Sequence, residues 1–408
     1  MRLYLAGMLT ERQLFLNLVA QTSTAPMMLE PERAEGIYVY DKNGNRYLDL
    51  IAGISVGNLG HRHPRVVDAI KKQADKYLHL MVYGEYVQSP QVQLAQLLTH
   101  HLPPHLDTVY FTNSGAEATE GAMKLAKRYT GKFEIVCFNK SYHGSTQGAL
   151  SLMGDEYFRN SFRPLLPGIT HVDYNDIHSL NVITDKTACV ILEPVQAESG
   201  VIVPDISFLK HLQKKCEQHK ALLIFDEAQT GMGRTGELFA FQKFGVTPDI
   251  LLTAKALGGG LPLGAFISSN EIMSSLTHEP VLGHLTTFGG NPLSCAAGLA
   301  ALQALLEEGW MKQVEEKEKL FHKLLQHPRV KMIRSCGLLM AIEFESDAFN
   351  KRVIEECWKY ELITDWFLFA PNCLRIAPPL IITEEEIEAA CRIILQAVEI
   401  AASEIKSL

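Results

Sequence analysis

The chain has 408 residues, of which 47% are hydrophobic and 21% are charged, so it can bury a large core, most simply in two domains. Its net charge of −8, without a long basic run, argues against nucleic acid as the main partner. No apolar run approaches the ~20 residues of a membrane span, and the opening MRLYLAG is too short for the apolar part of a signal peptide. We therefore expect a cytoplasmic protein that does not enter a membrane.

The eight cysteines include no C-x-x-C pair and lie in segments that resemble core. This pattern predicts buried thiols in a reducing compartment, in place of disulfides or a metal site. His61 and His63 form an H-x-H pair without a third ligand nearby, so we predict no metal. The sequence leaves open whether Met1 or Met8 is the first residue of the protein.

From about residue 64 the pattern alternates between helices and strands. Apolar residues at helical spacing predict helices over 64–78, 115–129 and 207–219. Short apolar runs predict strands over 107–112, 134–138, 188–194, 221–227 and 249–255. This alternation is typical of β-α-β units and predicts an α/β fold with a mostly parallel sheet that is buried on both faces.

After about residue 292 the pattern changes. An Ala/Leu-rich helix precedes a charged amphipathic helix over 311–326, and two strand candidates follow at 330–335 and 338–345. A last helix is predicted over 383–405, with Thr383 and Glu386 placed for a capping box. These elements predict a second, smaller α+β domain.

Polar or glycine-rich residues follow every predicted strand of the first domain. In chain order these stretches read NSGAEAT, KSYHGS, EPVQAESG, DEAQ and AKALGGG. The carboxyl ends of parallel strands open on one edge of a sheet, and ligands bind there. Five such stretches at one edge are hard to explain by structure alone, so the sequence predicts a ligand site.

The first stretch has the form of an anion site. Ser114 and Gly115 stand between a strand and a helix, where free backbone N–H groups and the helix dipole favour a phosphate. The plainer interpretation of this stretch alone is a serine cap on an ordinary turn.

Lys255 ends an apolar strand, where a charged amine is costly. Burial lowers a lysine's pKa, and a neutral amine can form a Schiff base with an aldehyde. A lysine that reaches the surface is the alternative, but the three glycines that follow suggest backbone packed against something.

Asp226 stands at the end of a buried strand and needs a cationic partner, which a protonated pyridine nitrogen would supply. Gln229 could donate to a ring hydroxyl, and Tyr142 could stack on the ring. Together with a phosphate site and Lys255, these residues describe a site for pyridoxal phosphate.

With these motifs, the chain resembles the class III (ornithine/acetylornithine-type) aminotransferases of fold type I. The resemblance runs from GIYVYDKNGNRYLDLIAGISVGNLGHRHP, residues 36–64, to LRIAPPLIIT, residues 374–383. It implies an N-terminal segment, 1–55, that packs with the small domain or lines the entrance of the site. A large cofactor-binding domain, 56–295, and a small C-terminal domain, 296–408, would follow.

The resemblance also implies roles for individual residues. Lys255 is the Schiff-base lysine and Asp226 pairs with the pyridine nitrogen, which makes these two the catalytic residues. Thr287 would reach the phosphate of the other subunit, so a homodimer with shared active sites is implied. The full set implied to bind the cofactor is Ser114, Gly115, Ala116, Tyr142, His143, Glu193, Asp226, Gln229, Lys255 and Thr287.

Substrate binding is implied for Glu198 and Arg375, which match the family's gate pair, and for Thr286. Paired, the two charges neutralise each other. When a dicarboxylate arrives, Glu198 would swing away and Arg375 would grip a carboxylate in fork geometry. A static salt bridge is the alternative.

The sequence departs from the family at the donor's anchor. Ornithine-type members usually carry arginine after the HG pair, where it grips the substrate's α-carboxylate, but this chain has Ser145 there. The family's QGE is here Gln196-Ala197-Glu198. An ω-amino acid, an amine, or an α-amino acid with another anchor therefore stay open as donors.

We predict transamination from an amino acid or ω-amine donor to a 2-oxo acid, with 2-oxoglutarate as the expected acceptor. Aminomutase, racemase and decarboxylase activities use the same cofactor residues, and Glu198 and Arg375 favour transamination over them. A non-catalytic cofactor-binding scaffold is a third reading, but such a protein would not need Lys255.

Overall fold

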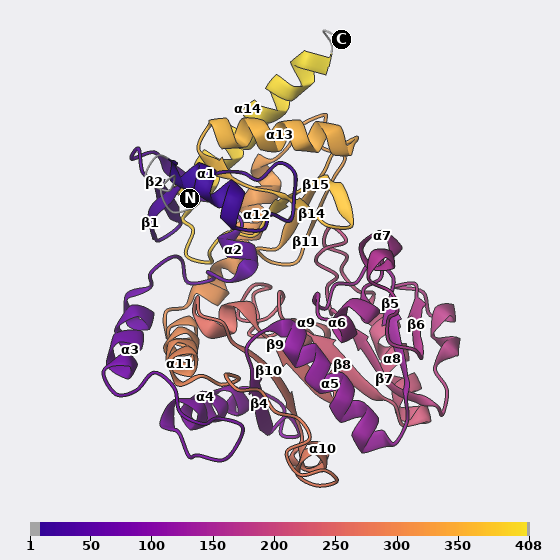
Figure 1. Ribbon diagram of the computed structural model, residues 1–408. Helices are drawn as coiled ribbons and strands as arrows, with labels where there is room; N and C mark the ends of the chain where they lie inside the picture. The colour runs from indigo at the N-terminus through magenta and orange to yellow at the C-terminus, as the bar shows by residue number, and fades with distance from the viewer. Residues whose placement is uncertain (1–8, 406–408) are drawn as a thin grey trace.

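The computed structural model describes residues 9–405, so the choice between Met1 and Met8 as first residue lies outside the described residues. Figure 1 shows the C-terminal elements, in orange and yellow, gathered with the N-terminal strands above the body that holds the largest sheet. None of the described helices is long and apolar enough to cross a bilayer. All eight cysteines are buried and free, which confirms the prediction of buried thiols.

The largest sheet has seven strands in the order β4-β10-β9-β8-β7-β5-β6. β10 is antiparallel to both neighbours and the other adjacent pairs are parallel, which confirms a mostly parallel sheet. The strands are β4 (Thr108–Thr112), β5 (Glu134–Phe138), β6 (Ile169–Val172), β7 (Thr187–Leu192), β8 (Leu222–Asp226), β9 (Ile250–Thr253) and β10 (Gly264–Ser268). The sequence pattern did not predict β6 or β10.

Alternate residues of each strand point to opposite sides of this sheet, so both faces carry apolar side chains. Helices cover both of these faces. In β7, Cys189 and Ile191 join the apolar cluster under α5 (Gly115–Thr130), and Val190 and Leu192 join the larger cluster that contains α8 (Ile206–His219). The predicted burial on both faces is therefore confirmed. Further along, α3 (Pro64–Ala74) and α4 (Ser89–His100) pack against the Ala/Leu-rich helix α11 (Pro292–Glu307).

A second sheet is built from the C-terminal third of the chain. It has the order β11-β12-β15-β14, and its neighbouring strands are antiparallel. Its elements are β11 (Met332–Ser335), β12 (Met340–Glu343), β14 (Trp366–Phe367), β15 (Ala370–Ile376), α12 (Val314–Leu324), α13 (Asp347–Lys359) and α14 (Glu384–Ile405). The predicted capping box of α14 is present: the Glu386 N–H donates to Thr383 Oγ1 at 3.3 Å, and the Thr383 N–H donates to Glu386 Oε2 at 2.8 Å.

A third sheet joins the two ends of the chain. It consists of β1 (Pro31–Glu35), β2 (Tyr38–Asp41), β3 (Arg46–Asp49) and β13 (Leu362–Ile363), and β3 pairs with β13 in parallel. The N-terminal segment is thus hydrogen-bonded to residues of the predicted small domain. The domain limits 1–55, 56–295 and 296–408 stay a prediction.

The remaining elements are short connectors, together with the N-terminal helix. They are α1 (Glu11–Leu18), α2 (Ala52–Ser55), α6 (Gln147–Leu152), α7 (Glu156–Arg159), α9 (Ala240–Phe244), α10 (Asn270–Ser274), η1 (Asn160–Phe162), η2 (His178–Val182), η3 (Lys255–Gly258), η4 (Ser275–Thr277) and η5 (Trp310–Gln313).

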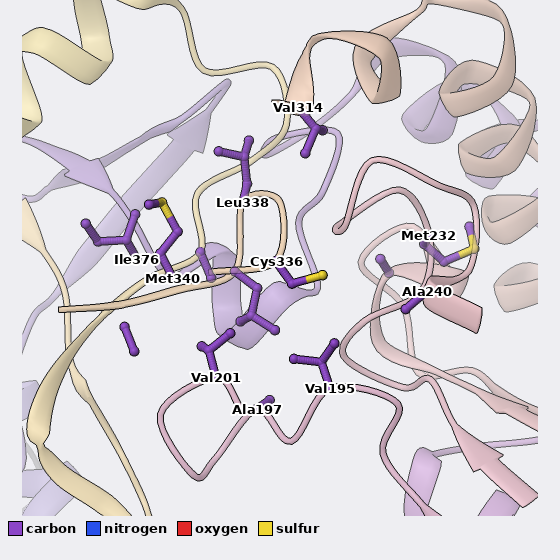
Figure 2. Close-up of a cluster of buried hydrophobic side chains, with 14 of the residues drawn as sticks. Val195, Ala197, Val201, Met232, Ala240, Val314, Cys336, Leu338, Met340 and Ile376 are labelled. Atoms are coloured by element: carbon purple, nitrogen blue, oxygen red, sulfur yellow. The ribbon is translucent and has the colours of Figure 1, made fainter. Parts of the chain in front are cut away.

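The loop that follows β7 lies between the largest sheet and the second sheet. Figure 2 shows its side chains Val195 and Val201 directed toward Cys336, which precedes β12, and Ala197 and Leu338 belong to the same apolar cluster. These apolar contacts fix the loop on both sides of Glu198, so the position of that carboxylate depends on the packing between the two sheets.

Candidate active site

A cavity of about 490 Å³ opens at the carboxyl ends of the parallel strands. The five polar stretches that follow those strands all contribute to its lining. Among the predicted residues, those at the cavity are Ser114, Gly115, Ala116, Tyr142, His143, Glu193, Asp226, Gln229 and Lys255. Glu198, Arg375, Thr286 and Thr287 do not line it.

Asp226 ends β8, whose preceding residues are apolar and buried. Its Oδ2 lies 2.8 Å from His143 Nδ1, and its Oδ1 accepts the Ala228 N–H at 3.0 Å. Glu227 faces elsewhere and accepts the backbone N–H groups of Ala240 and Phe241, each at 2.7 Å. Of the two adjacent carboxylates, therefore, only Asp226 faces the cavity.

Lys255 follows β9 in a left-handed backbone conformation, with φ of 51°. Its amine donates to Gln229 Oε1 at 2.6 Å. Burial lowers the pKa of the Lys255 amine, although the nearby Glu198 opposes the shift. The glycines after it allow close packing, because a Cβ on Gly259 would lie 2.9 Å from the Ala297 carbonyl oxygen of α11.

Glu193 connects two loops at the cavity. Its Oε1 accepts the Tyr142 N–H at 2.9 Å, and its Oε2 accepts the Ala197 N–H at 3.2 Å. Burial raises the pKa of the Glu193 carboxyl to about 7, with His143 acting in the opposite direction. The Tyr142 hydroxyl lies 3.2 Å from Ser145 Oγ, so this loop carries both the aromatic ring and the serine that departs from the family.

The first turn of α5 forms another wall. The Ser114 hydroxyl accepts the Glu117 N–H at 3.2 Å, so it caps the helix as the plainer interpretation supposed. Gly115 and Ala116 line the cavity, and their N–H groups belong to the turn that has no intrahelical acceptors. Gly144 approaches this turn so closely that an added Cβ would lie 2.5 Å from Ala116 Cβ. Such a turn is suited to an anion.

Glu198 and Arg375 form a bidentate ion pair beside the cavity. Arg375 Nη1 and Nη2 donate to Glu198 Oε1 and Oε2, each at 2.9 Å. Burial acts to raise the pKa of Glu198, but Arg375 outweighs it, and the pKa lies below its ordinary value. Both charges influence Lys255 electrostatically, so the pair is close to the cavity that it does not line.

Thr286 and Thr287 lie apart from this cavity. The Thr286 hydroxyl accepts the Gly289 N–H at 2.6 Å, and Thr287 is exposed to solvent. Their predicted contacts with phosphate and substrate stay predictions.

The two histidines of the H-x-H pair each bond to a carboxylate. His61 Nε2 lies 2.9 Å from Asp49 Oδ2, and His63 Nε2 lies 3.2 Å from Glu308 Oε2. Within residues 9–405, no group of three or more His, Cys, Asp or Glu side chains is arranged to hold a metal ion.

Comparison with known proteins places the chain in a family. A family model described as aminotransferase class-III matches residues 19–398. The chain is a class III aminotransferase. It is 42% identical to an acetylornithine aminotransferase of Methanopyrus kandleri, over 90% of this chain and 93% of that protein. It is 40% identical to one of Caldanaerobacter subterraneus, over 90% and 94%. Among solved structures, the ornithine aminotransferase of Toxoplasma gondii superposes with a TM-score of 0.89 at 32% identity, over 99% of this chain and 98% of that one.

This aminotransferase uses pyridoxal phosphate, and the cavity fits that group. Two buried nitrogen atoms, Gln229 Nε2 and His143 Nε2, have no hydrogen-bond partner among the described residues, and both side chains line the cavity. When bound, pyridoxal phosphate supplies an aldehyde that takes up the amino group and a ring that withdraws electrons from the reacting carbon. Gly115 and Ala116 are suited to its phosphate, and the Lys255 amine and the Asp226 carboxylate lie within the same cavity.

One charged residue beside the gate pair was not singled out by the sequence reasoning. Asp365 Oδ1 lies 2.9 Å from Arg375 Nε. The sequence gives little indication of this role, since a single acidic residue in LITDWF is typical of an ordinary turn. Only the pairing of distant strands reveals which cation it faces.

Proposed function

We propose that this aminotransferase moves the amino group of an amine that is not held through an α-carboxylate to 2-oxoglutarate. The charge of the cavity wall supports this donor. Among the described residues that line the cavity, Lys255 is the only lysine or arginine, and Ser145 stands where ornithine-type members carry an arginine. A donor's carboxylate would find no free cation there, whereas an uncharged tail would meet no unpaired charge.

In this proposal Lys255 attaches the cofactor and moves the proton at the reacting carbon. A lowered pKa makes the neutral amine, which is the form able to accept a proton, more available at neutral pH. Asp226 keeps the ring nitrogen protonated, and its bond to His143 holds the carboxylate in place. Gln229 would donate from its unpartnered Nε2 to the ring oxygen, and the aromatic side chain of Tyr142 would cover the ring face.

Glu198 and Arg375 allow one cavity to serve two unlike substrates. With the pair closed, both charges are neutralised and an uncharged donor is accepted. With Glu198 displaced, Arg375 offers two N–H groups in a fork that matches a carboxylate of 2-oxoglutarate. The fork is the geometry that this exchange requires, and separate measurement of the two half-reactions distinguishes it from a purely structural salt bridge.

We also propose a homodimer in which Thr287 reaches the cofactor phosphate of the other subunit. Thr287 is exposed, and large apolar side chains around it are exposed too: Leu282 is 49%, Leu285 is 46% and Phe288 is 56% accessible. Apolar groups gathered on one loop are typical of a surface that a partner covers. The eight free buried thiols support a reducing, cytoplasmic location.

A panel of donors tests the proposal. Each donor alone is mixed with the cofactor-loaded enzyme, and the change in the cofactor's absorption gives the rate of the donor half-reaction. We expect simple amines, which carry no carboxylate, to react faster than N-acetylornithine. If N-acetylornithine is the best donor of the panel, the proposed donor class is wrong.

The variant Ser145→Arg sharpens this test. A charge-assisted hydrogen bond contributes ~1.5–3 kcal/mol, so the rate with N-acetylornithine should rise roughly tenfold or more. The rate with a simple amine should change little. Ser145→Ala is the matched control, because it removes the hydroxyl without adding a cation, and it should leave the order of donors unchanged.

A further inference from the structure

Arg375 is surrounded by more partners than a gate requires. Its side chain is 3% accessible, and Glu198 occupies the end-on fork formed by Nη1 and Nη2. Asp365 Oδ1 lies 2.9 Å from Nε, on the opposite edge of the guanidinium. Nη2 also donates to the Trp366 carbonyl oxygen at 2.9 Å, and the ring centroid of Phe367 is 4.4 Å from the guanidinium carbon. The Arg375 guanidinium therefore contacts two carboxylates.

The two carboxylates differ in how they are attached. Asp365 belongs to the same hairpin as Arg375, and the Arg375 N–H donates to the Asp365 carbonyl oxygen at 2.9 Å. The two residues must therefore move together. Glu198 comes from the loop after β7, and its carboxylate reaches the hairpin with a longer side chain, where Leu368 N–H donates to its Oε2 at 3.0 Å. The Glu198 carbonyl oxygen also accepts the Phe369 N–H of this hairpin at 3.0 Å, so it is the Glu198 carboxylate that can leave without disturbing the strand pair.

We propose that Asp365 is a positioning residue that holds Arg375 in place while Glu198 is exchanged for a carboxylate of the substrate. This inference rests on the proposed gate function of Glu198 and Arg375. Without Asp365, displacement of Glu198 would leave a buried guanidinium with no anionic partner, which is costly. With Asp365 on Nε, the cation stays compensated and its end-on fork stays directed toward the departing Glu198 and its replacement.

The role is limited to one of the two half-reactions. The donor half-reaction proceeds with the gate closed, so it does not depend on a freed fork. The acceptor half-reaction needs the fork for 2-oxoglutarate. Asp365 should therefore affect the binding of 2-oxoglutarate and leave the rate with a simple amine unchanged.

Stopped-flow measurement of both half-reactions on the cofactor-loaded enzyme tests this role. In Asp365→Ala the dissociation constant of 2-oxoglutarate should rise roughly tenfold, as expected for a lost charge-assisted contact, with a limiting rate within about twofold of wild type. Asp365→Asn should show a similar loss, because the contact between Oδ1 and Nε is an ion pair without hydrogen-bond geometry and the amide carries no charge. Glu345→Ala is the matched control: it removes a carboxylate 2.9 Å from Arg329 near the same sheet and should change neither half-reaction.

A double-mutant cycle separates this inference from the gate itself. In the Arg375→Ala background, Asp365→Ala should cause no further loss, because Asp365 acts through the guanidinium. An equal loss in both backgrounds, equal slowing of both half-reactions, or tighter binding of 2-oxoglutarate in Asp365→Ala would overturn the role. If Arg375→Ala alone slows both half-reactions equally, the proposed gate has failed. If Arg375→Ala is selective and Asp365→Ala has no effect, only this inference has failed.

Discussion

Asp226 and Glu227 are adjacent, buried carboxylates, but they have different hydrogen-bond partners and face different parts of the molecule. The period of two in an extended chain turns one toward the cavity and the other away from it. Asp226 is left with His143 and one backbone N–H, whereas Glu227 accepts two backbone N–H groups and the Thr230 hydroxyl. Burial raises the pKa of Glu227 to about 7, and its hydrogen bonds oppose that shift.

This difference predicts unequal effects of the same substitution. Asp226→Asn keeps the shape of the side chain but removes the charge that, in the proposed function, compensates the protonated ring nitrogen. Breaking a buried ion pair costs ~3–5 kcal/mol, which corresponds to a loss of roughly 10²- to 10⁴-fold in the rate of the donor half-reaction. Single-turnover absorption measurements give this rate directly.

Glu227→Gln is the matched control for this prediction. It removes a buried carboxylate one residue away, outside the cavity, so it should lower thermal stability and leave the single-turnover rate within a few-fold of wild type. A near-normal rate in Asp226→Asn, or an equal loss in both variants, would mean that the charge of Asp226 is not what sustains the reaction.

Among the elements, α5 carries two functions at its first turn. Ser114 caps the helix with its hydroxyl, while Gly115 and Ala116, whose N–H groups have no intrahelical acceptor, line the cavity. The side chain and the backbone of one turn thus serve stability and ligand binding separately. The same cap is present at α14, where Thr383 accepts the Glu386 N–H away from the cavity.

We therefore expect Ser114→Ala and Thr383→Ala to have similar effects on stability. Loss of an N-cap hydroxyl costs ~1 kcal/mol, which should lower the thermal unfolding temperature of each variant by a degree or more. The affinity for pyridoxal phosphate, measured by titration of the apoenzyme, should be nearly unchanged in both if the phosphate is held by backbone N–H groups, as we predict. A large loss of affinity confined to Ser114→Ala would instead assign the hydroxyl to the phosphate.

Across the whole molecule, Arg234 connects segments that are far apart in sequence. It is fully buried, and its guanidinium donates to the carbonyl oxygens of Leu338, at 2.9 Å, and Pro378, and to the side-chain oxygen of Asn58. Burial lowers the pKa of Arg234 to about 9, with Asp49 acting against the shift, so the side chain is still protonated at neutral pH. One cation thus joins the loop after β8, the residues after α2 and two turns of the C-terminal third.

Arg234→Met should destabilise the molecule more than the loss of a single contact would. Each oxygen left unsatisfied costs ~1–3 kcal/mol, so the three together predict a fall in the unfolding temperature of roughly 3–10 °C. Lys317→Met is the matched control, because the Lys317 amine is also buried but donates to one carbonyl oxygen, that of Leu380, at 2.7 Å. A scanning calorimetry trace in which Arg234→Met melts no earlier than Lys317→Met would contradict the bridging role.

The sequence by itself determined the elements and motifs that depend on nearby residues. Apolar runs marked β5, β7 and β8, helical spacing marked α5 and α8, and the spacing of Thr383 and Glu386 marked the cap of α14. The family and its cofactor were also readable, because the polar stretches that line the cavity each follow a strand of the predicted sheet. Lys255, Asp226 and Tyr142 reach one cavity because parallel strands end at one edge.

Only the tertiary structure decided what depends on contacts between distant segments. β10 lies antiparallel between β4 and β9, and β13 pairs with β3 across more than half of the chain, and neither pairing leaves a local signal. The hydroxyl of Ser114 could face a phosphate or a backbone N–H, and the geometry of the turn decides for the N–H. Asp365 reads as an ordinary acid until the hairpin places it against Arg375, because the partner of a charge is set by the packing of strands and not by its neighbours in sequence.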